Sequence, residues 1–405
     1  MPDFQIENDV LTDYLGWDAR VVVPEGVRRI ARSAFERRKE YIESVVVPEG
    51  VIRIDDGALA CLPKLADLTL PGSLKAIPVL AFSDFAGLRS LILGEGLEVI
   101  SNLAFSGCRT LRYVSLPGSV SRLPDSVFKD LPNLETVTLH EGMTEIPCRM
   151  FENCTGLKSV LIPGSVTKIG NQAFVNCASL REIAIPDAVT EIGRETFWDC
   201  AGLTGFAVGA RNPNYMSEDG VLYDRAGTTL LRYPPGRPGQ TFVVPDRVTE
   251  FGDCAFQGAR NLLRVMVPAT VRKLGGAFRW CESLEGAILA DGVEEIAYDA
   301  FYGCKRLRRV IIPDSVTEIG DMAFYNCGLE SIVFPDGLTR IGKQAFYGCD
   351  LKEVIVPASV RSIGEKAFGF YRGFWEFRFS LTIVGDQGSE AERYARENKI
   401  RFVPL

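Results

Sequence analysis

Histidine is almost missing from this chain, with one residue in 405. A single imidazole leaves little room for histidine-based catalysis and excludes a metal site built from several histidines. Positive charge is also short, because 45 Lys and Arg stand against 52 Asp and Glu, giving a formal net charge of −7. Phosphate binding requires a basic surface, so this balance argues against nucleic acid as the main partner.

Long apolar runs are missing as well. No run approaches the ~18 residues of a membrane helix, so no membrane insertion is predicted. The opening residues, Met1–Phe4, begin neither the basic nor the apolar region of a secretory signal. The visible N-terminus therefore predicts a cytoplasmic protein, and a cell-surface or secreted location stays open if a leader has been removed.

What the chain does contain is a repeat. Hydrophobic residues make up 46% and charged residues 24%, which is typical of a soluble protein with a real core. An anchor Phe, replaced once by Leu, recurs every 22 to 24 residues except for one step of 59. The anchors are Phe35, Leu59, Phe82, Phe105, Phe128, Phe151, Phe174, Phe197, Phe256, Phe278, Phe301, Phe324, Phe346 and Phe368.

One unit, residues 157–180, shows the pattern of the others. Leu157, Val160 and Ile162 predict a short strand, which Pro163 ends because proline cannot donate to a ladder. A second extended piece carries Val166 and Ile169, and a turn follows. Such a unit cannot bury its apolar side chains alone, so the units must stack.

These units resemble the BspA-like, or type-5, leucine-rich repeats over roughly residues 20–370. The resemblance implies an α/β repeat solenoid: a right-handed leucine-rich repeat array with parallel strands on the concave face, few or short helices and one β-hairpin insertion. It implies an N-terminal capping hairpin (1–19), repeats (20–206), a β-hairpin insertion (207–240), further repeats (241–378) and a C-terminal strand–helix–strand cap (379–405). Within the insertion, Val221–Tyr223 and Leu230–Leu231 flank a turn, which is itself a hairpin signal.

Eight of the 11 cysteines stand three residues after an anchor: Cys108, Cys154, Cys177, Cys200, Cys281, Cys304, Cys327 and Cys349. On stacked rungs the Cα–Cβ bonds run parallel, so neighbouring Cβ atoms lie too far apart for good disulfide geometry. The sequence contains no Cys-x-x-Cys pair, so no zinc site is predicted. We expect buried, reduced thiols that pack as small hydrophobic groups. Cys61, Cys148 and Cys254 lie off this column.

A glycine follows the second extended piece at 170, 193, 252, 275, 320, 342 and 364. Proline takes the same position at 78, 124 and 147, and proline fixes φ near −65°. We therefore expect tight packing there and no left-handed backbone. His140 takes the place of the strand-ending proline, and no Ser, Cys or acid is tied to it by sequence.

Function is expected on the surface of the stacked strands. In each strand the residue before the last apolar one should face outward. From Val243 onward this column is wholly apolar, and Arg264, Arg309 and Glu353 lie on its border. A second stripe consists of the tyrosines that come directly after three of the anchor phenylalanines. The candidate binding residues are Val243, Arg264, Met266, Ile288, Arg309, Ile311, Val333 and Ile355, with Tyr302, Tyr325 and Tyr347 in the second stripe.

The sequence thus predicts a non-enzymatic leucine-rich repeat binding scaffold that mediates protein–protein interaction through the concave sheet face. An alternative is a bacterial cell-surface adhesin or glycan-binding protein. A third is an enzyme using the 207–240 insertion, which no nucleophile–base pair supports. No catalytic residue, metal or cofactor is predicted. The expected partner is a host or bacterial surface protein or a polysaccharide, and a monomer is favoured with the oligomeric state left open.

Overall fold

The computed structural model describes residues 3–55, 57–59, 62–83, 85–121, 123–369, 371–372, 376–377 and 381–405. The chain divides into two compact units. Unit 1 comprises Met1–Leu203 and Ala207–Asn214, and unit 2 comprises Thr204–Phe206 and Tyr215–Leu405. The division falls at β18 (Gly205–Val208).

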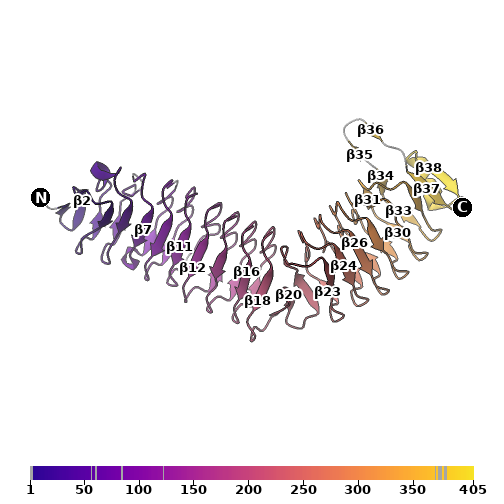
Figure 1. Ribbon diagram of the computed structural model, residues 1–405, viewed down its shortest axis with the longest axis horizontal. Coiled ribbons are helices and arrows are strands. Elements are labelled where there is room, and N and C mark those ends of the chain that lie inside the picture. Colours follow the sequence, from indigo (N-terminus) through magenta and orange to yellow (C-terminus); the bar gives the residue numbers. More distant parts are fainter. Residues whose placement is uncertain are drawn as a thin grey trace. The chain divides into compact units, whose positions relative to one another are not determined.

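In unit 1 each repeat forms one rung with a long strand, and the long strands stack in parallel (Figure 1). Apolar and polar residues alternate along these strands, so every second side chain enters the core. The long strands are β3 (Arg20–Val22), β5 (Ser44–Val46), β7 (Asp67–Leu70), β9 (Ser90–Leu93), β11 (Tyr113–Leu116), β12 (Thr136–Leu139) and β14 (Ser159–Leu161), followed by β16 (Glu182–Ile185).

In seven rungs of unit 1 a second, short strand follows, where the sequence predicts the second extended piece; none is described in the rung of β11. These strands are β4 (Arg29–Ile30), β6 (Arg53–Ile54), β8 (Ala76–Ile77), β10 (Val99–Ile100), β13 (Glu145–Ile146), β15 (Lys168–Ile169) and β17 (Glu191–Ile192). Two 3₁₀ turns occur, η1 (Glu36–Arg38) and η2 (Gly72–Leu74). The antiparallel strands β1 (Phe4–Glu7) and β2 (Val10–Tyr14) precede the first rung, and β2 pairs with β4.

Unit 2 begins with three antiparallel strands, β19 (Tyr215–Glu218), β20 (Val221–Asp224) and β21 (Thr229–Arg232). β20 and β21 form the hairpin that the sequence indicates, and β21 joins the rungs by pairing in parallel with β23. The long strands are β22 (Thr241–Val243), β24 (Arg264–Val267), β26 (Gly286–Leu289), β28 (Arg309–Ile311), β32 (Glu353–Ile355), β37 (Thr382–Gly385) and β38 (Arg401–Pro404).

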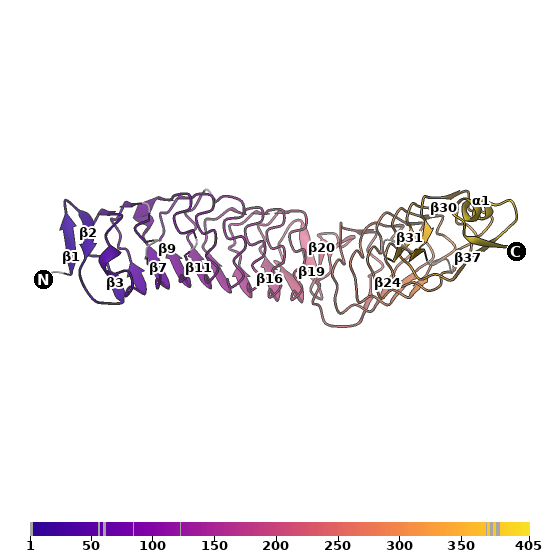
Figure 2. The same ribbon diagram turned by 90° about the horizontal axis from the view of Figure 1, so that it is seen from above.

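The short strands of unit 2 also stack in parallel. They are β23 (Glu250–Phe251), β25 (Lys273–Leu274), β27 (Glu295–Ile296), β29 (Glu318–Ile319), β30 (Arg340–Ile341) and β33 (Ser362–Ile363). Near the C-terminal end β31 (Phe346–Tyr347) pairs with β34 (Phe368–Gly369), and β35 (Tyr371–Arg372) with β36 (Glu376–Phe377). Figure 2 shows the helix α1 (Glu390–Glu397) beside β37, where it covers the last rungs of unit 2.

The anchor phenylalanines form a column of stacked rings inside each unit. In unit 1 the rings from Phe82 to Phe197 lie 5.4 to 6.1 Å apart from centroid to centroid. In unit 2 the rings from Phe256 to Phe368 lie 4.6 to 5.4 Å apart. Each anchor Phe is therefore packed between the anchors of the repeats above and below it, which is why the repeats must stack.

The expected tight packing holds at six of the seven positions in the glycine column, whereas a Cβ on Gly275 would meet nothing within 4 Å. None of the seven glycines has a positive φ. A Cβ on Gly342 would lie 2.4 Å from the backbone N of Asp321 on the preceding rung, so a side chain does not fit. The left-handed positions come two residues later, as at Gln344 with φ 54°, and one residue before the cysteine column, as at Asn326 with φ 52°.

Both units are thus stacks of parallel strands with few and short helices. The fold class predicted from the sequence, a repeat solenoid of leucine-rich repeat type, is confirmed. The domain boundaries given above remain a prediction.

Candidate binding face

The long strands of unit 2 place one apolar side chain per rung outside the sheet. Buried core residues such as Val265 and Ala287 alternate with exposed ones. We call the outward side of these strands the unit 2 face. Its apolar column consists of Val243, Met266, Ile288, Ile311, Val333 and Ile355, all exposed, from 40% for Met266 to 83% for Val333. The first four are register partners on neighbouring strands, so the structure brings them into one line.

The same position in unit 1 is mixed. Ile92 and Leu161 are exposed apolar residues, but Ser115 and Thr138 stand between them. Both kinds of residue occupy equivalent long strands, so the fold accepts polar side chains at this position. The unbroken apolar column is therefore a property of unit 2 and no requirement of the strand.

Arg264 and Arg309 border the column on the side where the strands begin, as the sequence suggests. Both side chains are exposed, and neither makes an ion pair or hydrogen bond with any residue that the structure describes. An arginine without a partner keeps five donors free for a carboxylate. Glu353 is exposed at the same position of β32.

A row of aspartates borders the column on the opposite side, just after the strands end. The row consists of Asp246, Asp291, Asp314 and Asp336, all exposed. Within the described part of the chain their carboxylates make no ion pair or hydrogen bond. The sequence reasoning missed this row, although its signal is a repeated Asp one residue after the strand-ending position.

The equivalent acids of unit 1 are occupied. Glu141 accepts the backbone N–H groups of Gly164 at 2.8 Å and Ser165 at 3.0 Å on the next rung. The bond from Gly164 lowers the pKa of this carboxyl. Asp187 likewise accepts the backbone N–H of Arg211. Acids at this position join the rungs in unit 1, whereas in unit 2 they remain free for a partner.

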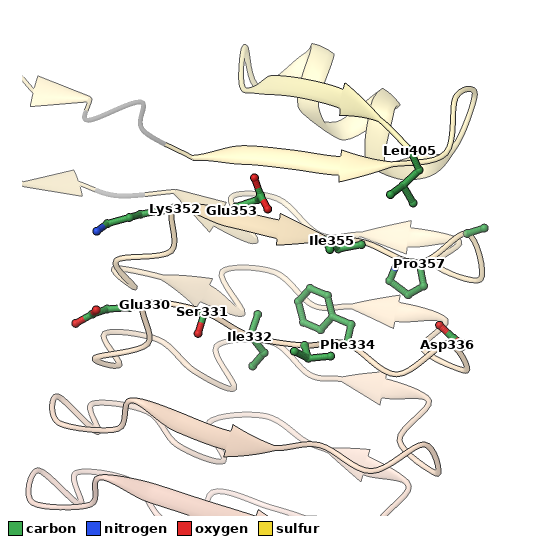
Figure 3. A pocket seen from close by; sticks show the side chains of 12 residues that line it. Glu330, Ser331, Ile332, Phe334, Asp336, Lys352, Glu353, Ile355, Pro357 and Leu405 are labelled. Carbon is green, nitrogen blue, oxygen red and sulfur yellow. The ribbon is translucent and has the colours of Figure 1, made fainter.

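A hollow opens on the unit 2 face next to Val333. It is a cavity of about 700 Å³ between residues 330–336 and 352–358, with Leu405 on its rim. Figure 3 shows Glu330 and Lys352 at one end, Pro357 and Asp336 at the other, and the Phe334 ring between them. Of the predicted binding residues, Val333 and Ile355 line it.

The strand ladder is interrupted at this hollow. Within residues 123–369 and 381–405, no backbone hydrogen bond joins residues 331–334 to β28 or β32. On the other side of the same rung, β30 still pairs with β29 and β33. The rung is therefore held at its short strand and open at its long segment.

In two features the sequence of this rung differs from that of the preceding rung, which carries β28. One residue separates Cys327 from Leu329, whereas two separate Cys304 from Leu307, so the turn before the long segment is shortened. Phe334 then fills a core position that smaller aliphatic residues fill on neighbouring rungs, and its ring lies 5.6 Å from the Phe346 ring. The next rung has the same one-residue spacing, from Cys349 to Leu351, and its strand β32 still pairs with β37. We therefore attribute the interrupted ladder to the short turn in combination with Phe334.

A protein-family comparison agrees with the rung pattern. The model of the BspA type leucine-rich repeat region matches residues 19–133, 80–204, 239–349 and 274–386, which together span well over half of the chain. The chain belongs to the BspA type leucine-rich repeat family. The search of curated proteins finds no match.

Solved structures of leucine-rich repeat proteins are similar over nearly the whole chain. A protein from Bacteroides ovatus is 25% identical, covers 98% of this chain and 94% of its own, and has a TM-score of 0.61. A leucine-rich cell surface protein from Faecalibacterium prausnitzii is 25% identical, covers 92% and 93%, and has a TM-score of 0.57. The pneumococcal vaccine antigen PcpA is 20% identical, covers 99% and 95%, and has a TM-score of 0.60, which shows a shared fold.

The tyrosine stripe of this BspA type chain is also in place. Tyr302, Tyr325 and Tyr347 are partly exposed, and their rings stack at 4.8 and 5.0 Å. Trp280 meets Tyr302 edge-on at 5.0 Å. Both faces of the Tyr325 ring are therefore covered by its neighbours, and only the ring edge and the hydroxyl group face outward.

The cysteine column fulfils its predicted role and adds a hydrogen bond. All eight thiols are buried, and none of them forms a disulfide. Each donates to the carbonyl of an anchor Phe on the preceding rung, as Cys304 does to Phe278 at 3.1 Å. Burial raises the pKa of Cys154 and Cys349 to about 12. Cys148 and Cys254 are partly exposed, and Cys61 lies outside the described residues.

His140 meets partners that the sequence did not indicate. Its Nε2 lies 3.0 Å from Ser115 Oγ, and its Nδ1 lies 3.9 Å from a carboxylate oxygen of Glu95. The second distance is too long for a hydrogen bond, so the carboxylate does not orient the imidazole as in a catalytic triad. The contact joins stacked rungs at the surface.

Two further observations concern the described residues only. None of their helices is long and apolar enough to span a bilayer. No group of three or more His, Cys, Asp and Glu side chains among them is arranged to hold a metal ion.

Proposed function

We propose that the chain is a non-enzymatic binding scaffold and that the unit 2 face binds a protein. The observation that carries this proposal is the unbroken column of exposed apolar side chains from Val243 to Ile355. A contiguous apolar patch with polar borders is typical of an interaction site, because water contact with it is unfavourable until a partner covers it. Free Arg and Asp side chains on the two borders would set the orientation of that partner.

The core does not need this column. The buried side chains of the same strands, such as Val265 and Val354, already supply the packing. Outward Thr or Ser would serve the strand equally well, as Ser115 and Thr138 do in unit 1. Replacing the outward residues should therefore test binding without unfolding the chain.

The experiment compares the wild-type chain with the double variant Ile311→Glu/Val333→Glu. Each protein is used to capture partners by cross-linking from host and bacterial lysates, and captured proteins are quantified by mass spectrometry. We expect a loss of about tenfold or more, because a charge without a partner is costly to bury in an apolar contact.

Leu161→Glu is the matched control. Leu161 is 66% exposed at the same strand position in unit 1, but its column neighbours are not an apolar run. The control should capture the same partners as the wild type. Unchanged capture by the double variant, with circular dichroism showing an intact fold, would refute the proposal.

A protein partner is favoured over a polysaccharide by the state of the tyrosines. Sugar-binding sites commonly expose a flat aromatic face, and the faces of Tyr325 are covered by Tyr302 and Tyr347. Glycan arrays would test this preference directly, since binding of a sugar that depends on Tyr325 and leaves the unit 2 face free would reverse it.

We further propose that the chain acts at a cell surface. The support is its similarity along nearly its full length to the leucine-rich cell surface protein from Faecalibacterium prausnitzii. The buried thiols, with their raised pKa values, would resist oxidation there. Brief protease treatment of intact source cells should remove the chain, and full protection would contradict a surface location.

A further inference from the structure

We infer that the partner segment for the unit 2 face is an amphipathic α-helix with an acidic and a basic flank. This inference rests on the proposed function and adds the secondary structure and charge pattern of the ligand. It is drawn from three features of the face: the spacing of its apolar column, the charges of its two borders, and the hollow at Val333.

The spacing of the column favours a helix over an extended peptide. Parallel strands are ~4.8 Å apart, and the anchor rings of the same rungs lie 5.1 to 5.2 Å apart. An amphipathic helix presents an apolar residue about every 3.6 residues, or ~5.4 Å along its axis. An extended peptide presents one on the same side only every ~6.7 Å.

The difference grows along the column. Over the five steps from Val243 to Ile355, the rungs advance ~24 Å, a helix ~27 Å and an extended strand ~33 Å. A helix tilted by ~25° from the stacking direction matches the rungs at every step, and tilts of about this size are common where helices pack. An extended strand would need a tilt of ~43°, which carries it ~22 Å sideways over the column, about twice the ~11 Å sideways shift of the helix. The matching helix has about 18 residues.

The two borders carry opposite charge along β24 to β28, whereas Glu353, at the arginine position of β32, is acidic. Arg264 and Arg309 stand two residues before the column residue of their own rung. Asp291 and Asp314 stand three residues after the column residue of theirs. Five residues of chain separate these borders, roughly 16 Å, and a helix with its side chains is ~10–12 Å wide. A helix lying on the column would therefore meet both borders, with its acidic flank on the arginines and its basic flank on the aspartates.

The hollow provides a place for one large side chain of the helix. Its walls include Val333, Phe334, Ile355 and Pro357. A Leu or Phe of the helix stripe that reaches the rung of Val333 would enter it and pack against these apolar walls, with charged side chains such as Glu330 and Asp336 at the ends of the hollow. Such a buried anchor typically supplies a large share of binding energy.

The test is a selection from a display library of random 18-residue peptides. The bait is the full chain, and peptides that still bind the Ile311→Glu/Val333→Glu variant are removed. We expect the enriched peptides to repeat apolar residues at i, i+3, i+4 and i+7, with Asp or Glu on one flank and Lys or Arg on the other. They should become helical on binding by circular dichroism.

The charge pattern is tested separately with the double variant Asp314→Lys/Asp336→Lys. It should weaken selected peptides about fivefold, since two exposed ion pairs are lost. Peptides with that basic flank changed to Glu should regain affinity for the variant. The same peptides should bind the Leu161→Glu control as they bind the wild type.

The outcomes separate the two proposals. Face-dependent peptides with apolar residues at every second position, or with no helix on binding, would overturn the helix inference and leave the protein-binding function standing. If no enriched peptide depends on Ile311 and Val333, the proposed function fails, and the inference fails with it. Helical peptides that bind regardless of Asp314 and Asp336 would overturn the charge assignment.

Discussion

The strongest test of the rung packing uses two glycines that look identical in sequence. Gly118 and Gly164 both stand in a Pro-Gly-Ser-Val segment, and neither has a positive φ. The following Ser makes the same bond in both rungs, Ser119 to Leu97 at 2.8 Å and Ser165 to Met143 at 2.7 Å. The perturbation is Gly→Ala at each position.

The surroundings of the new methyl group differ. A Cβ on Gly118 would lie 1.7 Å from the carbonyl oxygen of Glu141, which is backbone and cannot turn aside. A Cβ on Gly164 has as its nearest neighbour a side-chain oxygen of Glu141 at 3.4 Å, an ordinary contact. The backbone at Gly118 must move by more than 1 Å to admit the methyl group, and the backbone at Gly164 hardly at all.

The expected magnitudes follow from this contrast. Overpacking of this kind costs about 3 kcal/mol, so Gly118→Ala should destabilise unit 1 by that amount. Gly164→Ala should be neutral or stabilise it by up to about 1 kcal/mol, because alanine restricts the unfolded chain. For a unit of ~200 residues, 3 kcal/mol corresponds to a fall in Tm of about 6–12 °C.

The assay is thermal unfolding of both variants and the wild type by circular dichroism, with urea unfolding as a second measure. Equal midpoints for Gly118→Ala and Gly164→Ala would refute the packing argument. So would a loss at Gly164 as large as that at Gly118, because the structure gives the Gly164 methyl group free space.

Two other predictions concern thiols and acid stability. Iodoacetamide at pH 8 should label Cys148 and Cys254 in the folded chain and leave Cys304 unlabelled until urea is added. The reason is that burial raises the pKa of Cys304 and blocks access to its thiol. Peptide mass spectrometry that finds all three cysteines equally labelled would contradict this prediction. Asp55→Asn should destabilise the chain at pH 7. A hydrogen bond from Arg29 lowers the pKa of Asp55 in the folded chain, so the carboxylate stabilises the fold at pH values above the pKa that Asp55 has in the unfolded chain. The deficit in urea midpoint should narrow as the pH falls below 4, and a constant deficit would show that the charge is not involved.

The sequence predicts the regular features of the fold well because they follow from the repeat. Strand alternation is enough to place Val243 and Ile311 outside the sheet, and a proline at position 147 is enough to exclude a left-handed column at Gly170. The buried cysteines were expected for their size. Their hydrogen bonds to the anchor carbonyls were missed, because a bond between rungs depends on the turn geometry of both.

The irregular features escaped prediction for a related reason. Gly118 and Gly164 have the same neighbours in sequence, but the rung after Gly118 contains Gly142 with φ 110°, and Glu141 beside it directs its carbonyl oxygen at Gly118. Only the next rung decides which glycine is crowded. The hollow at Val333 likewise lies where a turn one residue shorter is combined with Phe334 in the core, and these features gain meaning only when rungs are stacked.

The unit 2 face combines features that a solenoid can change independently of its stability. Its outward column lies on strands whose inward side chains form the core, so a residue such as Ile311 can be replaced while Val265 and its equivalents keep the rungs together. The carboxylates after the strands of unit 2 make no hydrogen bond or ion pair with the described residues, whereas Glu141 in unit 1 accepts a hydrogen bond from the next rung. A position that does not contribute to stacking in one unit is available for recognition there. This is why an apolar column and two free charged borders together indicate binding more strongly than any of them alone.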